Sequence, residues 1–345
     1  MLSQLVIIDA SACVYTGMTS PKHRDRTYYK YAVGGLHYLF RYITTNLARK
    51  NDIIVAFDSR SFRNDLIDGY KAGRSHDKRV HSQLELAYKY LTSSNIACYK
   101  YDGYEADDII YWAVQQNVGK YYEIEIYGND KDLLHNIQDT VSFKSIRADM
   151  NSVYMINYEK SIEKGKTIRF NTISAYKVFC GCKSDKIPSL SLQCGLRGEQ
   201  IYKKYLEFLD KEKIPSIYKV ITNSKLVNLF ASLSGLFTKD EQLEVYNRVN
   251  LIYPATCPSG IEVVGKGINA VNKDVFNWTL SLFNDYESIF CMKYNKIALS
   301  NDDIALLKDY SNQILTGAYE VDRNQRCEYS YLDAFDEENL FLRDV

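Results

Sequence analysis

The chain has 345 residues, enough to bury the core of one large domain or of two smaller ones. Its 43 lysines and arginines balance its 43 aspartates and glutamates, so net charge gives no sign of a polyanionic partner and any basic surface has to be local. Its eight cysteines, without a secretory leader or an apolar run long enough to span a bilayer, predict free thiols in a reducing cytoplasm and no membrane contact.

Three apolar runs in the first 130 residues each end on an aspartate, namely Asp9, Asp58 and Asp130. Short runs rich in Ile and Val that alternate with helical stretches are typical of buried parallel strands, and the carboxyl ends of such strands face one crevice. Carboxylates that meet in a crevice repel one another unless they are protonated or a cation neutralises them. The sequence therefore predicts an α/β fold, with a twisted, mainly parallel sheet flanked by helices and a magnesium or manganese site at its carboxyl edge.

A fourth segment combines an acidic cluster with the amphipathic pattern of a helix. Glu105, Asp107 and Asp108 fall in its first turn, where acids also suit the helix dipole, so simple capping is the alternative. Glu105 and Asp108 share a face, whereas Asp107 lies to one side, where it could reach a second ion or support another ligand. Farther on, Asp132 follows Asp130 by two residues, and the two point the same way if the chain is still extended there.

Five segments in this order resemble the 5′-nuclease superfamily, the flap endonuclease and 5′-3′ exonuclease group that includes phage ribonuclease H enzymes and the nuclease domain of bacterial DNA polymerase I. The resemblance covers residues 1 to about 195 well and continues faintly to about residue 285. No polymerase segment follows, so we expect a stand-alone enzyme as in phage replication systems, located in the host cytoplasm if a phage encodes it. The segments are LVIIDASACVY, VAFDSRSFRNDLIDGYKAGR, GYEADD, YGNDKDLL and GCKSDKIPSL.

The resemblance also implies how the chain divides. A PIN-like catalytic domain is expected over residues 1–180, with an arch region at about 60–95. A helical 5′-3′ exonuclease C-terminal domain is expected over 181–290, and a helical or partly disordered acidic tail over 291–345.

A basic segment lies between the second aspartate and the acidic cluster. A charge run is usually a solvated face, which is the plain alternative here. Arg63, Tyr70, Lys71 and Arg74 nevertheless match the superfamily pattern at the base of an arch over the active site. The resemblance implies that Lys71 and Arg74 contact the scissile phosphate and stabilise developing charge, and that Arg63 binds nucleic acid. Tyr70 would stack on a base near the cut, with core packing as its alternative.

The second half departs from the superfamily at Cys182. Relatives carry two aspartates in a Gly-Asp-x-x-Asp-Asn-Ile-Pro-Gly stretch, whereas this chain has GCKSDKIPS, so Asp185 remains and Cys182 replaces the first carboxylate. A thiolate is a soft ligand, so we expect weaker magnesium binding at the second ion, reduced activity and a preference for manganese. The alternative is that Cys182 is an inert core thiol and that water or Asp107 fills its place. A zinc site at Cys180, Cys182 and Cys194 lacks further paired ligands, and the histidines are expected mostly at the surface.

Downstream, the superfamily places a glycine-rich helical hairpin that contacts duplex phosphates, often with a bound potassium ion. The glycine spacing here is poor, but a helix beginning after Gly198 could hold a phosphate with Lys203 and Lys204, with helix capping as the alternative. Residues 328–345 combine acids with aromatic side chains, which is typical of a segment that binds a partner, here expected to be a replication protein, or masks its own protein. A terminal amphipathic helix is the alternative.

The expected mechanism is hydrolysis of phosphodiester bonds by two metal ions about 4 Å apart, one activating water and the other stabilising the leaving 3′ oxygen. Magnesium is the expected ion and manganese the alternative. The first ion is assigned to Asp9, Asp58, Glu105 and Asp108, and the second to Asp130, Asp132 and Asp185, with Asp107 between them.

The expected substrate is DNA, or RNA paired with DNA, with a 5′ end, a flap or an RNA primer, in primer removal during replication or repair. The products would carry 5′ phosphates. Two other classes stay open. A PIN-class ribonuclease shares the sheet and the acids but lacks the arch region and the C-terminal helical domain. A branched-DNA-binding protein that has lost catalysis is supported by Cys182 alone, and the surviving carboxylates argue against it because binding does not need them.

Overall fold

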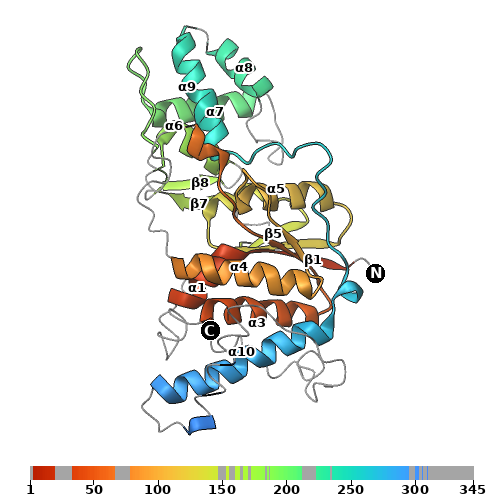
Figure 1. Cartoon of the computed structure of the whole chain (residues 1–345). Helices are drawn as coiled ribbons and strands as arrows, with labels where there is room; N and C mark the ends of the chain where they lie inside the picture. Colours follow the sequence, from red (N-terminus) through yellow and green to blue (C-terminus); the bar gives the residue numbers. More distant parts are fainter. Residues whose placement is uncertain are drawn as a thin grey trace.

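A six-stranded sheet forms the centre of the molecule (Figure 1). Its strands lie in the order β3-β2-β1-β4-β5-β6, and neighbouring strands are parallel except for β5 and β6. The predicted α/β class with a mainly parallel sheet is thus confirmed. The strands are β1 (Gln4–Asp9), β2 (Asp52–Ala56), β3 (Ala97–Tyr99), β4 (Glu123–Gly128), β5 (Val141–Ser145) and β6 (Val153–Tyr154). The computed structural model describes residues 3–19, 33–66, 78–146, 153–154, 160–163, 166–169, 172–182, 185, 187–211, 223–233, 235–294, 300–302, 305 and 309.

Helices cover both faces of the sheet, as a parallel sheet requires. Successive side chains of β1 alternate between these faces: Val6 and Ile8 belong to the core that includes side chains of α1, α3 and α4, and Leu5 and Ile7 belong to the core that includes side chains of α5. All four side chains are fully buried, and each such burial stabilises the fold by about 1.5–3 kcal/mol. The helices are α1 (Ala10–Thr19), α3 (Gly34–Ala48), α4 (Lys78–Ser93) and α5 (Ala106–Asn117).

A helical unit with a core of its own lies beyond the carboxyl edge of the sheet (Figure 1). Phe179, Tyr205, Leu229 and Val245 are among the buried side chains of this core. An antiparallel pair, β7 (Lys160–Glu163) and β8 (Lys166–Arg169), precedes the unit. Its helices are α6 (Ile173–Cys180), α7 (Gly198–Lys211), α8 (Asn223–Ser232) and α9 (Lys239–Ile252).

The chain then returns to the sheet through an extended strap, residues 253–272 (Figure 1). Along α5, Trp112 Nε1 donates to the carbonyl of Ala255 at 2.7 Å, and Asn117 Nδ2 donates to the carbonyl of Val263 at 2.7 Å. The short η5 (Ile268–Ala270) lies near the end of the strap. The strap therefore joins the helical unit to the outer side of α5.

The last long helix, α10 (Lys273–Tyr294), packs against α3 (Figure 1). The ring of Phe40 stacks on that of Phe276 and meets that of Phe283 edge-on, both with centroids 5.2 Å apart. The domain bounds of 1–180, 181–290 and 291–345 stay a prediction, and most of the last range lies outside the described residues. Over the described ranges, every helix is too short or too polar to cross a bilayer.

Candidate metal centre

Asp9 and Asp58 lie at neighbouring strand ends on the carboxyl edge of the sheet. Asp9 is the last residue of β1 and pairs in register with Ala56, the last residue of β2. Asp58 accepts a hydrogen bond from Ser11 Oγ at 2.5 Å and another from the amide of Ala106 at 2.9 Å. These bonds join Asp58 to the starts of α1 and α5, so the structure brings these two predicted ligands together.

The Asp9 carboxyl group belongs to a cluster of negative charges. Burial, followed by the charges of Asp58 and Asp130, raises the pKa of Asp9 to about 7. The residue is only 8% exposed, so water offers its ionised form little compensation. A carboxyl group in such surroundings stays protonated or needs a cation beside it.

Asp130 and Asp132 lie on a tight turn rather than on an extended strand. The 3-10 turn η2 (Lys131–Asn136) begins directly after Asp130, whose carboxylate accepts a hydrogen bond from the amide of Asp132 at 2.9 Å. The chain is therefore no longer extended here, and the prediction that both aspartates point the same way on an extended strand is wrong. Burial and the charge of Asp130 raise the pKa of Asp132 to about 7, with a smaller contribution from Asp185.

Lys177 of α6 is a member of this site that the sequence did not reveal. Its ammonium group is buried and pairs with Asp132 at 2.5 Å. Burial alone lowers the pKa of a lysine, but the carboxylates of Asp132 and Asp130 outweigh this effect and raise the pKa of Lys177 above its usual value. The one available hint was a single lysine in an otherwise apolar or uncharged helix, because a buried lysine is almost always paired.

Arg63 lies in the interior, which contradicts its predicted role as a nucleic-acid contact. It is 3% exposed and binds both carboxylate oxygens of Asp108, at 2.8 and 2.7 Å. It also donates to the carbonyl of Tyr253 at 2.9 Å. Its guanidinium group is therefore occupied within the protein, where it joins η1 (Phe62–Asp65) to α5 and to the end of α9.

Asp108 is correspondingly committed to the fold. Besides Arg63, its oxygens accept from the amides of Ala255 at 2.7 Å and Glu105 at 3.0 Å, and the residue is fully buried. The prediction that Asp108 binds the first ion is contradicted by these contacts, because its lone pairs are already taken. The alternative reading, in which an acid caps the first turn of the helix, describes its bond to Glu105.

Glu105 and Asp107 are half-buried and line a narrow crevice beside the strand ends. The crevice has a volume of about 30 Å³, which is room for a water-sized species. Within the described ranges, no three acidic, histidine or cysteine side chains already form the ligand set of one ion. The residues that line the crevice are Arg63, Glu105, Asp107, Asp108, Asp130, Asp132, His135, Asp185, Leu251, Ile252 and Pro254.

His135 also lines the crevice, although the histidines were expected mostly at the surface. Both of its ring nitrogens are shielded from solvent, and its ring lies 5.8 Å from that of Tyr111. Burial lowers the pKa of His135 to about 4, so its imidazole is neutral near pH 7. His37 is buried as well, within α3.

Cys182 occupies the position of the missing carboxylate in a tight loop. It is 6% exposed, and its thiol donates to a carboxylate oxygen of Asp185 at 3.0 Å. The backbones of Cys182 and Ile187 exchange two hydrogen bonds of 2.8 Å. Gly181 has a φ of 77°, and a Cβ there would approach the carbonyl oxygen of Ile187 to 2.5 Å, so the loop requires glycine.

The remaining predicted contacts lie elsewhere. Tyr70, Lys71 and Arg74 fall outside the described residues. Lys203 is exposed and Lys204 half-buried on α7, away from the crevice lining.

Comparison with known proteins agrees with these features. Residues 4–167 match the family model of the 5′-3′ exonuclease, N-terminal resolvase-like domain. DNA polymerase I of Chloroflexus aurantiacus is 29% identical over 196 residues, which are 54% of this chain and 20% of that protein. DNA polymerase I of Geobacillus stearothermophilus is 27% identical over 195 residues, which are 55% of this chain and 22% of that protein. The chain thus spans about a fifth of the length of these curated relatives.

Two solved structures align with most of the chain at low sequence identity. The T5 5′-exonuclease with bound zinc has 16% sequence identity and a TM-score of 0.48, with 91% of this chain and 98% of that chain covered. Human GEN1 in complex with Holliday junction DNA has 12% identity and a TM-score of 0.45, with 92% and 75% covered. The family-model match over residues 4–167 confirms the resemblance to the 5′-nuclease superfamily seen in the sequence motifs.

Proposed function

We propose that the protein hydrolyses phosphodiester bonds near the 5′ end of DNA, or of RNA paired with DNA, with the help of divalent metal ions. The supporting observation is the acidic cluster at the carboxyl edge, where burial and mutual repulsion raise the pKa values of Asp9 and Asp132 to about 7. Carboxyl groups crowded in this way do not stabilise the fold, so they point to a site that a hard cation completes.

The donor set fits magnesium, because it consists of hard carboxylate oxygens around a crevice that holds a water-sized species. Bound there, two ions would activate the attacking water and stabilise the leaving 3′ oxygen. Manganese is the alternative, since Cys182 stands where a further carboxylate would serve the second ion. We assign Asp9, Asp58 and Glu105 to the first ion, Asp130, Asp132 and Asp185 to the second, and Asp107 to a position between them.

Two buried cationic residues position this site from the protein side. Lys177 offsets part of the charge of Asp130 and Asp132 and draws Asp132 towards α6. Arg63 fixes Asp108, and through it the first turn of α5 that carries Glu105. Both residues thus hold acids in place while the crevice itself stays lined by carboxylates.

Contacts to the substrate are proposed on the superfamily pattern. Lys71 and Arg74 would bind the scissile phosphate, and Tyr70 would stack on a base near the cut. Lys203 and Lys204 would contact duplex phosphates, with a potassium ion as a further candidate near the start of α7.

The wider role is inferred from the relatives, which are DNA polymerases. We infer primer removal or flap processing during DNA replication or repair, in the cytoplasm. Residues 328–345, which combine acidic and aromatic side chains, would bind a replication protein.

Cleavage of a duplex with a 5′ flap, labelled at each end, tests the proposal. Reactions contain magnesium, manganese or a chelator, with Asp130→Ala as the site variant. Asp139→Ala is the matched control, because Asp139 is exposed in the turn before β5, at the opposite edge of the sheet. We expect metal-dependent cutting near the junction that Asp130→Ala abolishes and Asp139→Ala retains. Cutting that persists in the chelator would contradict the proposed dependence on metal ions.

A branched-DNA-binding protein without catalysis is the second candidate, and the substitution at Cys182 favours it. Such a protein would bind the flapped duplex with unchanged affinity in Asp130→Ala and would cut it in neither metal. Binding measured beside cutting therefore separates the two functions.

A further inference from the structure

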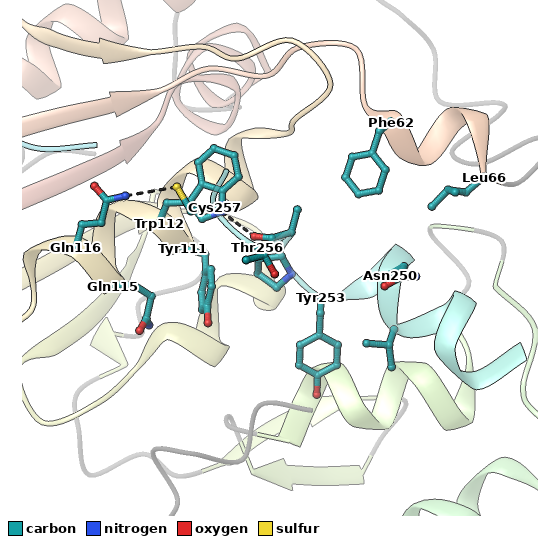
Figure 2. A pocket seen from close by; sticks show the side chains of 13 residues that line it. Phe62, Leu66, Tyr111, Trp112, Gln115, Gln116, Asn250, Tyr253, Thr256 and Cys257 are labelled. Carbon is teal, nitrogen blue, oxygen red and sulfur yellow. Dashed lines mark hydrogen bonds between the residues drawn. The ribbon is translucent and has the colours of Figure 1, made fainter. Parts of the chain in front are cut away.

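A second hollow opens beside the acidic crevice, and aromatic, apolar and uncharged polar side chains line it. Its volume is about 660 Å³, whereas pockets for small ligands usually measure about 300–1,000 Å³. Figure 2 shows Phe62 of η1 and Leu66, which follows η1, across the opening from Tyr111 of α5, with Tyr253 at the end of α9 below them.

This pocket and the crevice are neighbours on the same elements. Both are lined by Pro254. On η1, Arg63 lines the crevice and Phe62 lines the pocket. On α5, Asp107 lines the crevice and Tyr111, four residues later, lines the pocket, a distance of about 6 Å along the helix axis. A polymer whose backbone lies at the crevice therefore reaches the pocket with an adjacent unit.

The walls of the pocket are already held in place. Trp112 donates from Nε1 to the carbonyl of Ala255, and Gln116 donates to the carbonyl of Ile261 at 3.1 Å, so these two residues serve as wall. The guanidinium carbon of Arg63 lies 4.7 Å from the centroid of the Phe62 ring and supports that ring. Little side-chain freedom is lost when a ligand enters such a pocket.

The lining suits a nucleobase, which has flat apolar faces and polar edges. Phe62, Tyr111 and Tyr253 supply aromatic surface, and the exposed amides of Gln115 and Asn250 supply donors and acceptors at the rim. No charged side chain lines the pocket in the part of the chain that the structure describes. Phosphates would consequently stay outside, near the crevice, while stacking holds bases of any sequence.

We propose that this pocket holds an unpaired base of the 5′ single strand, one or two nucleotides from the bond that is cut. The inference rests on the proposed function and names the part of the substrate that the site recognises. It makes a single-stranded 5′ extension a feature that the protein binds directly.

Fluorescence of 2-aminopurine, which falls when this base stacks on an aromatic ring, tests the proposal. The probe is placed at successive positions of a 5′ flap and within the duplex, and it is read in chelator so that no cutting occurs. The variants are Tyr111→Leu and Phe62→Leu, which retain apolar volume but remove an aromatic face. Tyr122→Leu is the matched control, since Tyr122 is 56% exposed and precedes β4 at the opposite edge of the sheet.

We expect strong quenching at one or two flap positions in the wild type and in Tyr122→Leu. Each pocket variant should lose most of this quenching and bind the flapped duplex about fivefold to tenfold more weakly. The variants lie on different elements, and their thermal unfolding midpoints are compared, so a folding defect in one is recognised. Equal quenching at all positions, no quenching, or quenching unchanged in both pocket variants would overturn the proposal.

Cutting in magnesium, measured separately, keeps this proposal distinct from the proposed function. A protein that cuts without position-specific quenching has the nuclease function but not the base pocket. A protein that shows the quenching pattern but never cuts has the base pocket and lacks the nuclease function.

Discussion

Burial and nearby negative charge favour the protonated form of the Asp9 and Asp132 carboxyl groups. Each is close to Asp130, and each is shielded from water. An uncharged His135 lines the crevice together with Asp132. Protonation of these residues therefore links the stability of the metal-free protein to pH.

The direction of this pH dependence follows from the pKa values. The pKa of Asp9 and of Asp132 is 3.8 in the unfolded chain and about 7 in the folded protein, so the folded state binds more protons between these pH values. The contribution of each aspartate to stability therefore falls as pH rises from 3.8 to 7. The pKa of His135 is 6.5 in the unfolded chain and about 4 in the folded protein, so its contribution to stability rises between pH 4 and 6.5. Because the effect of two aspartates outweighs that of one histidine, the free energy of unfolding should fall by about 1 kcal/mol per pH unit between pH 5 and 7.

Urea unfolding in chelator at pH 5, 6, 7 and 8 checks this expectation. The free energy of unfolding should fall from pH 5 to 7, and magnesium should restore more of it at pH 8 than at pH 5. Asp9→Asn should flatten the slope, and His135→Gln should steepen it. A rise in stability between pH 5 and 7 would contradict the assignment.

Replacement of Cys182 by aspartate tests whether the thiol limits the second ion. Cys182→Asp places a hard ligand beside Asp185, so the magnesium concentration for half-maximal cutting should fall several-fold and the preference for manganese should shrink. Cys182→Ser, similar in size but without a carboxylate, is the control and should leave the metal dependence unchanged. Equal behaviour of both variants would mean that the thiol is inert packing.

Among the elements, the Arg63–Asp108 ion pair joins η1, α5 and the end of α9. Removing one partner of a buried pair leaves the other charge uncompensated, so Arg63→Ala should lower the free energy of unfolding by about 3–5 kcal/mol. Arg60→Ala breaks the neighbouring pair with Asp65, whose side chains are 80% and 68% exposed, and should change stability by less than about 1 kcal/mol. Denaturant unfolding of both variants gives the comparison, and similar losses would contradict a structural role for Arg63.

The strands and their terminal aspartates could be predicted because apolar β-branched runs are local patterns. The contacts of Asp108 and the role of Lys177 could not, since each depends on a partner far away in the chain. The turn after β4 could also have been predicted from the sequence. Aspartate side chains in turns often accept a hydrogen bond from the amide two residues later, as Asp130 does from Asp132.

At the scale of the whole molecule, α10 completes the outer layer over α3. Phe276 is fully buried against Phe40, so Phe276→Ala should cost about 3–5 kcal/mol. Leu243→Ala, at a position of α9 that is 59% exposed, is the control and should change stability by less than about 0.5 kcal/mol. Unfolding should be followed by tryptophan fluorescence. A loss below about 1 kcal/mol for Phe276→Ala would mean that α10 is not part of the cooperative core.

The strap has a mechanical consequence. The helical unit from α6 to α9 is spliced into the nuclease unit rather than appended to it, because the chain leaves the sheet before α6 and returns to it through residues 253–272. Both junctions lie at the crevice: Lys177 reaches Asp132 at one, and Tyr253 receives the hydrogen bond of Arg63 at the other. Because the helical unit is attached at these two junctions, its main possible motion is a rotation about the line that joins them. A rotation of the helical unit about this line would therefore have its axis at the acidic crevice.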